Sequence, residues 1–442
     1  MEKAKTRKLN ITFESEISST QDHDVHEPHQ KKSAKGGGGK SSVGQTGFWI
    51  YFAIASVPLV LVLGNSMLVP ILPEMKDQLG ISRFQSSLVI TLFSLTAGFL
   101  IPVAGFLSDR FSRKAVMIPA LIIYGAAGVL AGFGAIWHSY TIIIISRAIQ
   151  GIGAAGTSSI AMALVGDLYN GGTESKVLGI TEAANGFGKV ISPILGSAFA
   201  LLVWFAPFFA FPLFCLISLL CVMFIIKEPK KTKEPPSLGK YMHQIGAILK
   251  AKGRWLIPAF IAGSLALFNL FGVLFYLSDT LEEAPYKIDG IIKGLVLAIP
   301  LLAMVITSYT TGALIKKNGT LMRWLINIGF VLLSVTLGCC IFFHDNMYLF
   351  IGLLTVGAVG TGLILPCLNT MITGSVEKEQ RGMITSIYNS LRYIGVAFGP
   401  PLFGYLMKIS NEMVFIVVTS LAVIALAMVF FLIRPSGKLE SA

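Results

Sequence analysis

Long apolar segments alternate with short polar ones along the chain between residues 48 and 433. A helix of about 20 residues crosses the roughly 30 Å of hydrocarbon in a bilayer, and each apolar segment is at least that long. The pattern predicts an all-α membrane protein with twelve transmembrane helices. The predicted spans are residues 48–72, 84–107, 115–136, 140–165, 177–202, 207–226, 255–277, 291–314, 324–343, 348–372, 383–406 and 413–433.

Two polar segments are longer than the other connections. Residues 1–46 end in a glycine- and lysine-rich stretch that cannot bury a core, so we predict a disordered cytoplasmic tail. Three histidines recur in it at every third residue, but ordering a flexible tail around an ion costs much entropy, and we expect no metal site. Residues 228–254 form a proline- and lysine-rich central loop, and their apolar spacing allows an interfacial helix.

Composition and charge agree with a membrane protein. The chain is 54% hydrophobic and 13% charged, whereas soluble domains are about 25% charged. If both termini are cytoplasmic, the inner segments hold 27 of the 35 Lys and Arg residues and the outer loops hold 5. This bias predicts that orientation and explains the net charge of +12 without a nucleic-acid partner. The five cysteines fall within predicted spans without metal-ligand spacing.

A charged turn at residues 105–114 joins the second and third spans. Gly105 lets the two helices approach, and the side chains of Asp109, Arg110 and Arg113 can tie the hairpin at the membrane surface. Together with Asp167, at the inner end of the fourth span, they can form a conformational latch on the cytoplasmic side. The alternative is a loop that is basic only because it lies inside the cell.

Charged residues also lie deep within the spans. Glu182 is the only carboxylate well inside an apolar run, and an ionised carboxylate there must be paired, hydrated or protonated. We predict that it couples proton movement to transport, because exchanging a proton for substrate at one carboxyl is the minimum such coupling needs. The alternative is a structural ion pair with Lys189, although these residues lie about 10.5 Å apart along the helix axis.

Three bases, Arg147, Lys189 and Arg392, accompany this single acid. The excess positive charge disfavours a cation and favours an anionic or neutral amphipath, such as an acidic antibiotic or a catechol-type siderophore. Structural roles remain open, with Arg147 bonding helix carbonyls and Arg392 closing an interface. Aromatic and amide side chains could complete a pocket, or could simply pack in the core. The candidate cavity residues are Asn65, Gln150, Asn185, Lys189, Phe268, Asn269 and Arg392.

The two halves of the chain repeat weakly. A degraded copy of the charged turn follows the eighth span at residues 312–319, and polar and proline positions of the fifth span recur in the eleventh. We therefore predict two pseudo-symmetric six-helix bundles, at residues 47–227 and 255–434, with a cytoplasmic tail at residues 435–442. A substrate path is expected along the interface between the bundles.

At these motifs the chain resembles the major facilitator superfamily, and within it the twelve-helix drug:proton antiporters of bacteria. The turn at residues 105–114 matches the loop motif of the superfamily, except that Ser112 stands where a second glycine is usual. In the fourth span, Arg147 and Gln150 match an Arg-x-x-Gln-Gly-x-Gly pattern, and the resemblance implies that Arg147 takes part in proton coupling. The fifth span resembles the antiporter signature at Gly179, Gly186, Gly188, Pro193 and Gly196, which we interpret as helix-packing positions.

The sequence thus predicts a secondary transporter and not an enzyme. We expect proton-coupled efflux of a small amphipathic compound by alternating access, by a monomer in the bacterial plasma membrane. The proton gradient replaces any cofactor, and the chain has no Gly-x-x-x-x-Gly-Lys-Ser/Thr nucleotide loop. Two alternatives remain open: a proton-coupled importer of a nutrient, and a membrane sensor or enzyme, which would need a catalytic constellation that is not visible.

Overall fold

The computed structural model describes residues 47–169, 171–228, 237–315, 318–376 and 378–433. The predicted tails, at residues 1–46 and 435–442, lie outside the described residues. The described part of the chain is helical, and it contains no strand. Its elements are α1 (Phe48–Ser66), η1 (Val69–Ile71), α2 (Leu72–Leu79), α3 (Arg83–Arg110), α4 (Arg113–Ile136), α5 (Tyr140–Ala155), α6 (Ser158–Leu168), α7 (Gly171–Ala200), α8 (Ala206–Phe224), α9 (Leu238–Glu282), α10 (Gly290–Leu314), α11 (Gly319–Phe343), α12 (Met347–Thr373), α13 (Lys378–Leu406) and α14 (Asn411–Leu432).

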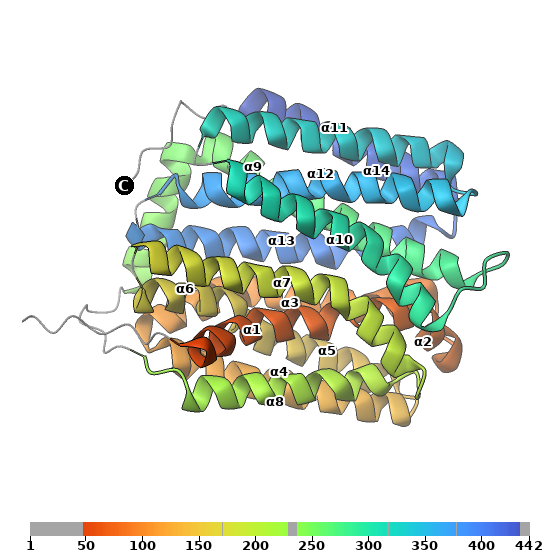
Figure 1. The fold of residues 1–442 in the computed structure, drawn as a ribbon, viewed down its shortest axis with the longest axis horizontal. Coiled ribbons are helices and arrows are strands. Elements are labelled where there is room, and N and C mark those ends of the chain that lie inside the picture. The colour runs from red at the N-terminus through yellow and green to blue at the C-terminus, as the bar shows by residue number, and fades with distance from the viewer. Residues whose placement is uncertain (1–46, 170, 229–236, 316–317, 377, 434–442) are drawn as a thin grey trace, which may run out of the picture. The chain divides into compact units, whose positions relative to one another are not determined.

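These helices provide the twelve predicted spans. Ten helical segments of the described chain are long and apolar enough to cross a membrane, counting α1 to α2 as one and α5 to α6 as another. The remaining two spans are α7 and α13, of 30 and 29 residues, which carry more charged side chains but lie alongside the others (Figure 1).

The odd-numbered spans run opposite to the even-numbered ones. We call the end where α1 begins and α14 finishes the terminal end, and the opposite one the far end.

Helix α9 differs most from its predicted length. It runs unbroken for 45 residues, from the central loop through the seventh span to Glu282, five residues beyond the predicted end. Ser237 caps its first turn, and the buried ring of Tyr241 packs 5.3 Å from the ring of Phe106 in α3. Residues 238–249 therefore continue the span and contact α3, where the sequence had allowed a separate interfacial helix.

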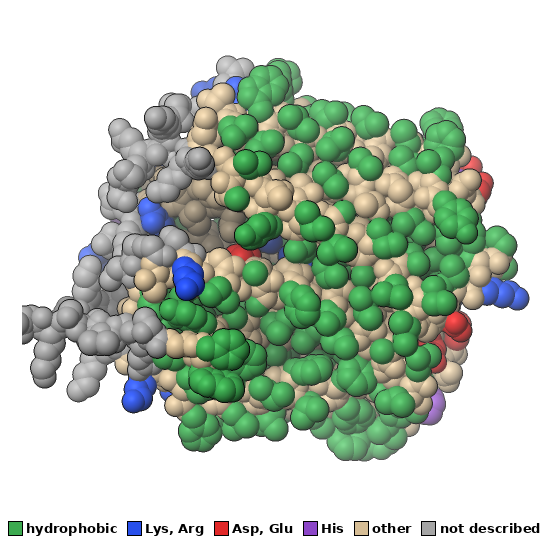
Figure 2. Space-filling model, in the orientation of Figure 1, with side chains coloured by type: hydrophobic (Ala, Val, Ile, Leu, Met, Phe, Trp, Pro, Cys, Tyr) green, Lys and Arg blue, Asp and Glu red, His purple; other side chains and the backbone are tan. Residues whose placement is uncertain are grey.

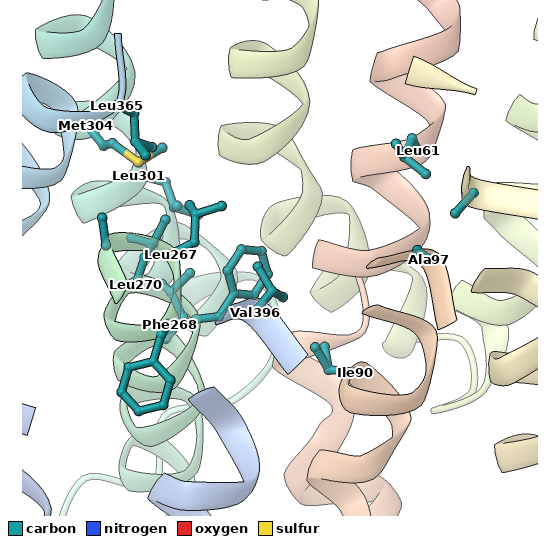
Figure 3. Packing of buried hydrophobic residues seen from close by; sticks show 14 of the residues in the cluster. Leu61, Ile90, Ala97, Leu267, Phe268, Leu270, Leu301, Met304, Leu365 and Val396 are labelled. Atoms are coloured by element: carbon teal, nitrogen blue, oxygen red, sulfur yellow. The ribbon is translucent and has the colours of Figure 1, made fainter. Parts of the chain in front are cut away.

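The bundles of α1–α8 and α9–α14 meet along two helix pairs, α3 with α13 and α7 with α10. At the first pair, the Thr91 hydroxyl donates to the Ala397 carbonyl over 2.7 Å. Ile90, Val396 and Phe268 lie close to this contact (Figure 3). Because α3 and α10 are the second spans of their bundles and α7 and α13 the fifth, the two contacts are equivalent by the predicted pseudo-symmetry.

Candidate functional site

Helices α7 and α10 touch toward the far end and diverge toward the terminal end. A Cβ atom built on Gly186 would lie 3.0 Å from a methyl of Val305 in α10, and one on Gly294 would lie 2.6 Å from the Pro193 carbonyl oxygen. Nearer the terminal end, Gly179 and Gly312 have nothing within 4 Å of the same position. Figure 2 shows the resulting hollow between the two bundles, with acidic and basic side chains visible inside it.

One face of α7 is turned toward this hollow. Glu182, Gly186, Lys189 and Pro193 share a face, because they follow one another at spacings of three or four residues. Since Gly186 and Pro193 meet α10, the two charged residues also point toward the other bundle. Glu182 is exposed and Lys189 is half-buried. The carboxylate that the sequence placed deep in a span is thus accessible from the hollow.

Helix α13 of the second bundle brings a further cation within electrostatic reach of Lys189. Arg392 is half-buried, its guanidinium carbon lies 5.4 Å from the centre of the Tyr388 ring, and its Nη1 donates to Asn389 over 3.3 Å. The charges of Arg392 and Glu182 both act on the Lys189 ammonium. We call Glu182, Asn185, Lys189, Asn389 and Arg392 the central cleft.

Two polar atoms of the central cleft remain unused by the protein. Nε of Arg392 and Oδ1 of Asn185 are buried, and neither has a hydrogen-bond partner within the part of the chain that the structure describes. Buried polar atoms are usually paired. The cleft therefore offers a donor and an acceptor, in addition to its charges, to a molecule that enters it.

Arg147 is not part of the central cleft. It is fully buried inside the first bundle, where its guanidinium carbon lies 4.4 Å from the centre of the Phe93 ring. Its Nε donates to the Val89 carbonyl over 2.9 Å, and its Nη2 donates to Oδ1 of Asn65 over 3.0 Å. Its Nη1 donates to the Gly64 carbonyl and to Gln150.

These partners are all uncharged, and they belong to α1, α3 and α5. They fix the last turn of α1, just before the chain bends into η1 at Val69. The contacts agree with the structural alternative for Arg147, in which it bonds helix carbonyls. They place Asn65 and Gln150 in the sealed bundle interior with it and away from the hollow. The coupling role that the motif implies for Arg147 stays a prediction.

The two cavity candidates on α9, Phe268 and Asn269, also lie outside the central cleft. Phe268 is 6% exposed and packs 6.2 Å from the ring of Phe403 in α13. Asn269 points into a cavity of about 20 Å³ inside the second bundle, lined by residues of α9 to α12. That volume holds about one water molecule and no substrate. In this conformation neither residue joins the central cleft.

The glycines of the fifth span pack against two different helices. Gly188 lies over Leu59 of α1, and Gly196 meets the Met67 carbonyl at the end of the same span. Gly186 faces α10, as described above, while Gly179 lies in open space. Three of these glycines thus lie where α7 approaches a neighbouring helix closely, and Pro193 contributes its carbonyl to the contact with α10.

The predicted latch residues form a cluster at the terminal end. Arg113 donates from Nη1 to Asp109 over 2.5 Å and from Nε to Asp167 over 2.8 Å. Arg110 is exposed and lies outside these pairs. The three paired residues belong to α3, α4 and α6 of the first bundle, so their ion pairs do not themselves join the two bundles.

Gly105 makes the contact between bundles that the ion pairs lack. A Cβ atom there would lie 2.8 Å from Oγ of Ser386 in α13, so the glycine permits close approach of α3 to the second bundle. Ser112, which replaces a glycine of the family motif, has an extended backbone and caps α4 by accepting from the Ala115 amide. The turn therefore needs no second glycine.

Glu228, which the sequence did not single out, caps the same helix. Its carboxylate accepts from the Arg113 amide over 2.6 Å and from the Lys114 amide over 3.0 Å. A carboxylate at a helix N-terminus satisfies free amides and complements the helix dipole. No sequence signal identified it, because it is 114 residues away from the helix that it caps.

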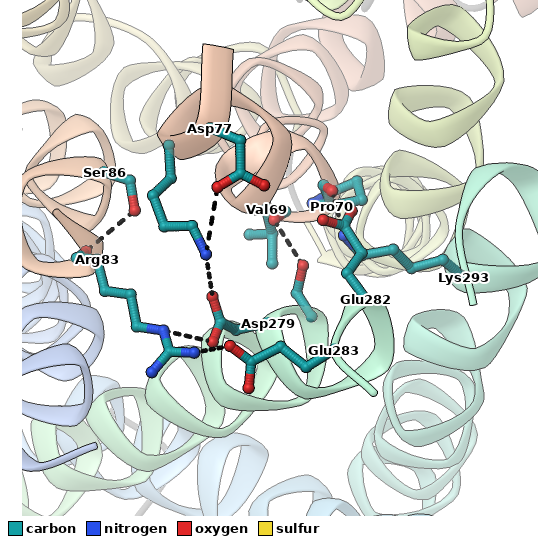
Figure 4. Close-up of polar contacts among 11 residues, drawn as sticks. Val69, Pro70, Asp77, Arg83, Ser86, Asp279, Glu282, Glu283 and Lys293 are labelled. Carbon is teal, nitrogen blue, oxygen red and sulfur yellow. Dashed lines mark hydrogen bonds and ion pairs between the residues drawn. The ribbon is translucent and has the colours of Figure 1, made fainter. Parts of the chain in front are cut away.

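A second charged cluster, also missed, lies at the far end (Figure 4). It joins α2 and α3 of the first bundle to the far end of α9, where Lys293 of α10 pairs with Glu282. The sequence analysis counted its cations as outer-loop charges and ended the seventh span before its carboxylates. The residues are Lys76, Asp77, Arg83, Asp279, Glu282, Glu283 and Lys293; we call them the far-end cluster.

Comparison with known proteins identifies the family. A sequence model of the Major Facilitator Superfamily matches residues 54–335 and 259–442. The chain belongs to the major facilitator superfamily. This superfamily protein is a transporter and not an enzyme. It is 44% identical over 383 residues to the "Bacillibactin exporter" of Bacillus subtilis (strain 168), covering 86% of this chain and 95% of the relative.

Two further comparisons agree with this assignment. The "Multidrug efflux protein YfmO" of Bacillus subtilis (strain 168) is 29% identical over 361 residues, covering 81% of this chain and 86% of the relative. The crystal structure of the human organic anion transporter MFSD10 (TETRAN) superposes with a TM-score of 0.65 at 18% identity, covering 86% of this chain and 99% of that one. The structural likeness confirms the predicted twelve-helix fold in two bundles.

Proposed function

We propose that this transporter exports a small anionic or neutral amphipath from the cytoplasm of a bacterium in exchange for protons. The terminal end, which carries most of the basic residues, faces the cytoplasm in this proposal. The hollow then opens inward, where an exporter must collect its substrate. The relatives named as a bacillibactin exporter and a multidrug efflux protein support export over nutrient import.

One observation carries the proposed substrate class. Lys189 and Arg392 come from opposite bundles and both belong to the central cleft, where the charge of Arg392 acts on Lys189 and Glu182 is the one carboxylate of the set. Two cations facing one cleft repel each other, and an anionic group between them relieves that repulsion and accepts hydrogen bonds from both. A substrate bound there would contact both bundles, as alternating access requires.

Glu182 is the proposed coupling group. In the present conformation it is exposed to the hollow, so a proton carried by it can pass to the cytoplasm. After the bundles rock, the same side chain would meet the outer medium and take up another proton. Each proton that enters down 100 mV supplies about 2.3 kcal/mol, enough to concentrate a compound appreciably outside the cell. We also propose that the protein functions as a monomer, with no cofactor besides the proton gradient.

Inside-out membrane vesicles with an acidic lumen test this proposal. Bacillibactin, a neutral amphipath and a cationic dye are added to the buffer, and accumulation of each compound and alkalinisation of the lumen are measured together. We expect both signals for bacillibactin, weaker signals for the neutral compound and none for the dye. Glu182→Gln should abolish the lumen signal while leaving bacillibactin binding in place.

Charge variants of the cleft test the substrate class. Lys189→Gln and Arg392→Gln should each weaken bacillibactin binding by about tenfold, the value of one charged hydrogen bond. Lys408→Gln, which removes an exposed cation between α13 and α14, is the matched control and should have no effect. Equal transport by all three variants would contradict the proposed anion site, and accumulation in right-side-out vesicles alone would favour import.

A further inference from the structure

The far-end cluster joins the two bundles through buried charges. Asp279, at the far end of α9, is 3% exposed and forms ion pairs with Nε of Arg83 at 2.8 Å and with the ammonium of Lys76 at 4.0 Å. Arg83 also pairs with Glu283. Since Lys76 and Arg83 belong to the first bundle and Asp279 to the second, each of these pairs must break if the bundles separate at this end (Figure 4).

A second connection lies beside the first. The ammonium of Lys293, in the first turn of α10, is 2% exposed, pairs with Glu282 at 2.5 Å and donates to the Pro70 carbonyl over 2.5 Å. The Ser278 hydroxyl donates to the neighbouring Val69 carbonyl over 3.0 Å. Both carbonyls belong to η1, where the first span is interrupted, so the ends of α9 and α10 are held against that interruption.

We propose that the far-end cluster is a gate that holds the transporter closed at the far end, with Asp279 as the residue that positions it. When the gate is closed, Asp279 is dry and its charge is balanced by Arg83 and Lys76. When the bundles part, all three side chains enter water. Removing one partner of a buried pair leaves an uncompensated charge only in the closed conformation, so the variant should favour the open one.

The gate differs in kind from the latch at the terminal end. The Asp109, Arg113 and Asp167 pairs stay within the first bundle, so a movement between bundles can leave them intact. The far-end pairs cannot survive such a movement. The energetic difference between the two conformations therefore includes the far-end cluster directly, whichever substrate the central cleft binds.

A cysteine at residue 197 reports the opening of this gate. Ser197, in α7, is 3% exposed next to Gly294 of α10, and its hydroxyl has no hydrogen-bond partner in the described part of the chain. Replacing it by cysteine therefore loses no hydrogen bond. A thiol at this position should react with a bulky fluorescent maleimide only when α7 and α10 separate at the far end.

The experiment measures the labelling rate of Ser197→Cys in purified full-length protein in lipid nanodiscs. Adding Asp279→Asn, or Arg83→Gln as an independent variant, should raise the rate by about tenfold or more. The exchanged pair Arg83→Asp with Asp279→Arg should return it toward the parent value. Asp345→Asn is the matched control, because Asp345 is an exposed far-end carboxylate that lies 3.4 Å from Nε2 of His344 in its own bundle.

Protein without Ser197→Cys gives the background from native cysteines, and gel filtration confirms that each variant is folded. Unchanged labelling in folded Asp279→Asn and Arg83→Gln would overturn the gate, as would equal acceleration by Asp345→Asn. If Asp279→Asn does not fold, Arg83→Gln and the exchanged pair decide the question. The assay uses neither substrate nor proton gradient, so its result is independent of the proposed exported compound.

Discussion

A methyl group added to Gly294 should change which end of the transporter is open. Gly294 lies in α10 where that helix crosses α7, and its new Cβ atom would be 2.6 Å from the Pro193 carbonyl oxygen and 2.9 Å from Cα of Ile194. Both neighbours are backbone atoms, so no side-chain rotation can relieve the overlap. We therefore expect Gly294→Ala to push α7 and α10 apart at the far end.

The contacts give the size of the effect. An ordinary van der Waals contact begins at 3.4 Å, so the helices must part by 3.4 minus 2.6, or 0.8 Å, at this point. Overpacking of this kind costs about 1–3 kcal/mol in a packed interface. The cost applies only to the conformation in which the helices touch. It should shift the equilibrium by roughly 5- to 150-fold toward the conformation open at the far end.

Distances between spin labels at residues 78 and 348 would detect this shift. Gln78 in α2 and Tyr348 in α12 are exposed, lie at the far end and belong to different bundles. In a background with the native cysteines replaced, Gly294→Ala should add a longer distance to the measured distribution. Gly352→Ala, at a position with nothing within 4 Å, is the control. Identical distributions for parent and Gly294→Ala would refute the argument that this contact sets the far-end spacing.

Three other substitutions test contacts within the first bundle. Arg147→Lys should lower the melting temperature, because an ammonium cannot replace the divergent guanidinium bonds, each worth about 1.5–3 kcal/mol; normal stability with lost transport would instead support the coupling role. Gly153→Ala should reduce the yield of folded protein in gel filtration, since its Cβ atom would lie 2.6 Å from the Ala120 carbonyl oxygen, whereas Gly179→Ala, in open space, should not. Glu228→Gln should lower the free energy of unfolding by about 1 kcal/mol in thermal denaturation, through the weakened cap of α4, and an unchanged midpoint would contradict this.

The spans could be predicted because membrane insertion depends on a property that is local in sequence. Twenty or more apolar residues must form a helix in hydrocarbon, since each backbone amide needs a partner there. The ends of α9 could not be predicted in the same way. Leu238 is exposed and Glu282 is paired with Lys293 in a charged cluster, so hydropathy does not distinguish a helix from a loop at either position.

The charged sites also differ in whether the signal for them is local in sequence. The sequence placed Glu182, Lys189 and Arg392 in spans, and the structure brings them to one cleft because α7 and α13 are equivalent helices of a symmetric pair. The sequence also placed Arg147 within a span, but the structure buries it inside the first bundle. Its carbonyl partners are 58 and 83 residues away in sequence, so no local pattern reveals them. Arg83 and Asp279 meet only after both bundles have formed, so their pairing is invisible in the sequence.

The length of α9 connects residues 238–254 of the predicted central loop to the far end of the molecule. The helix is about 68 Å long by the rise of an ideal helix, it touches α3 through Tyr241 near its beginning, and it carries Asp279 and Glu282 at its other extremity. Pro258 lies between, where the lost backbone hydrogen bond makes a helix easy to bend. Residues 238–254 and the carboxylates of the far-end cluster are therefore parts of one helix, so a displacement of the first can reach the second without crossing a loop.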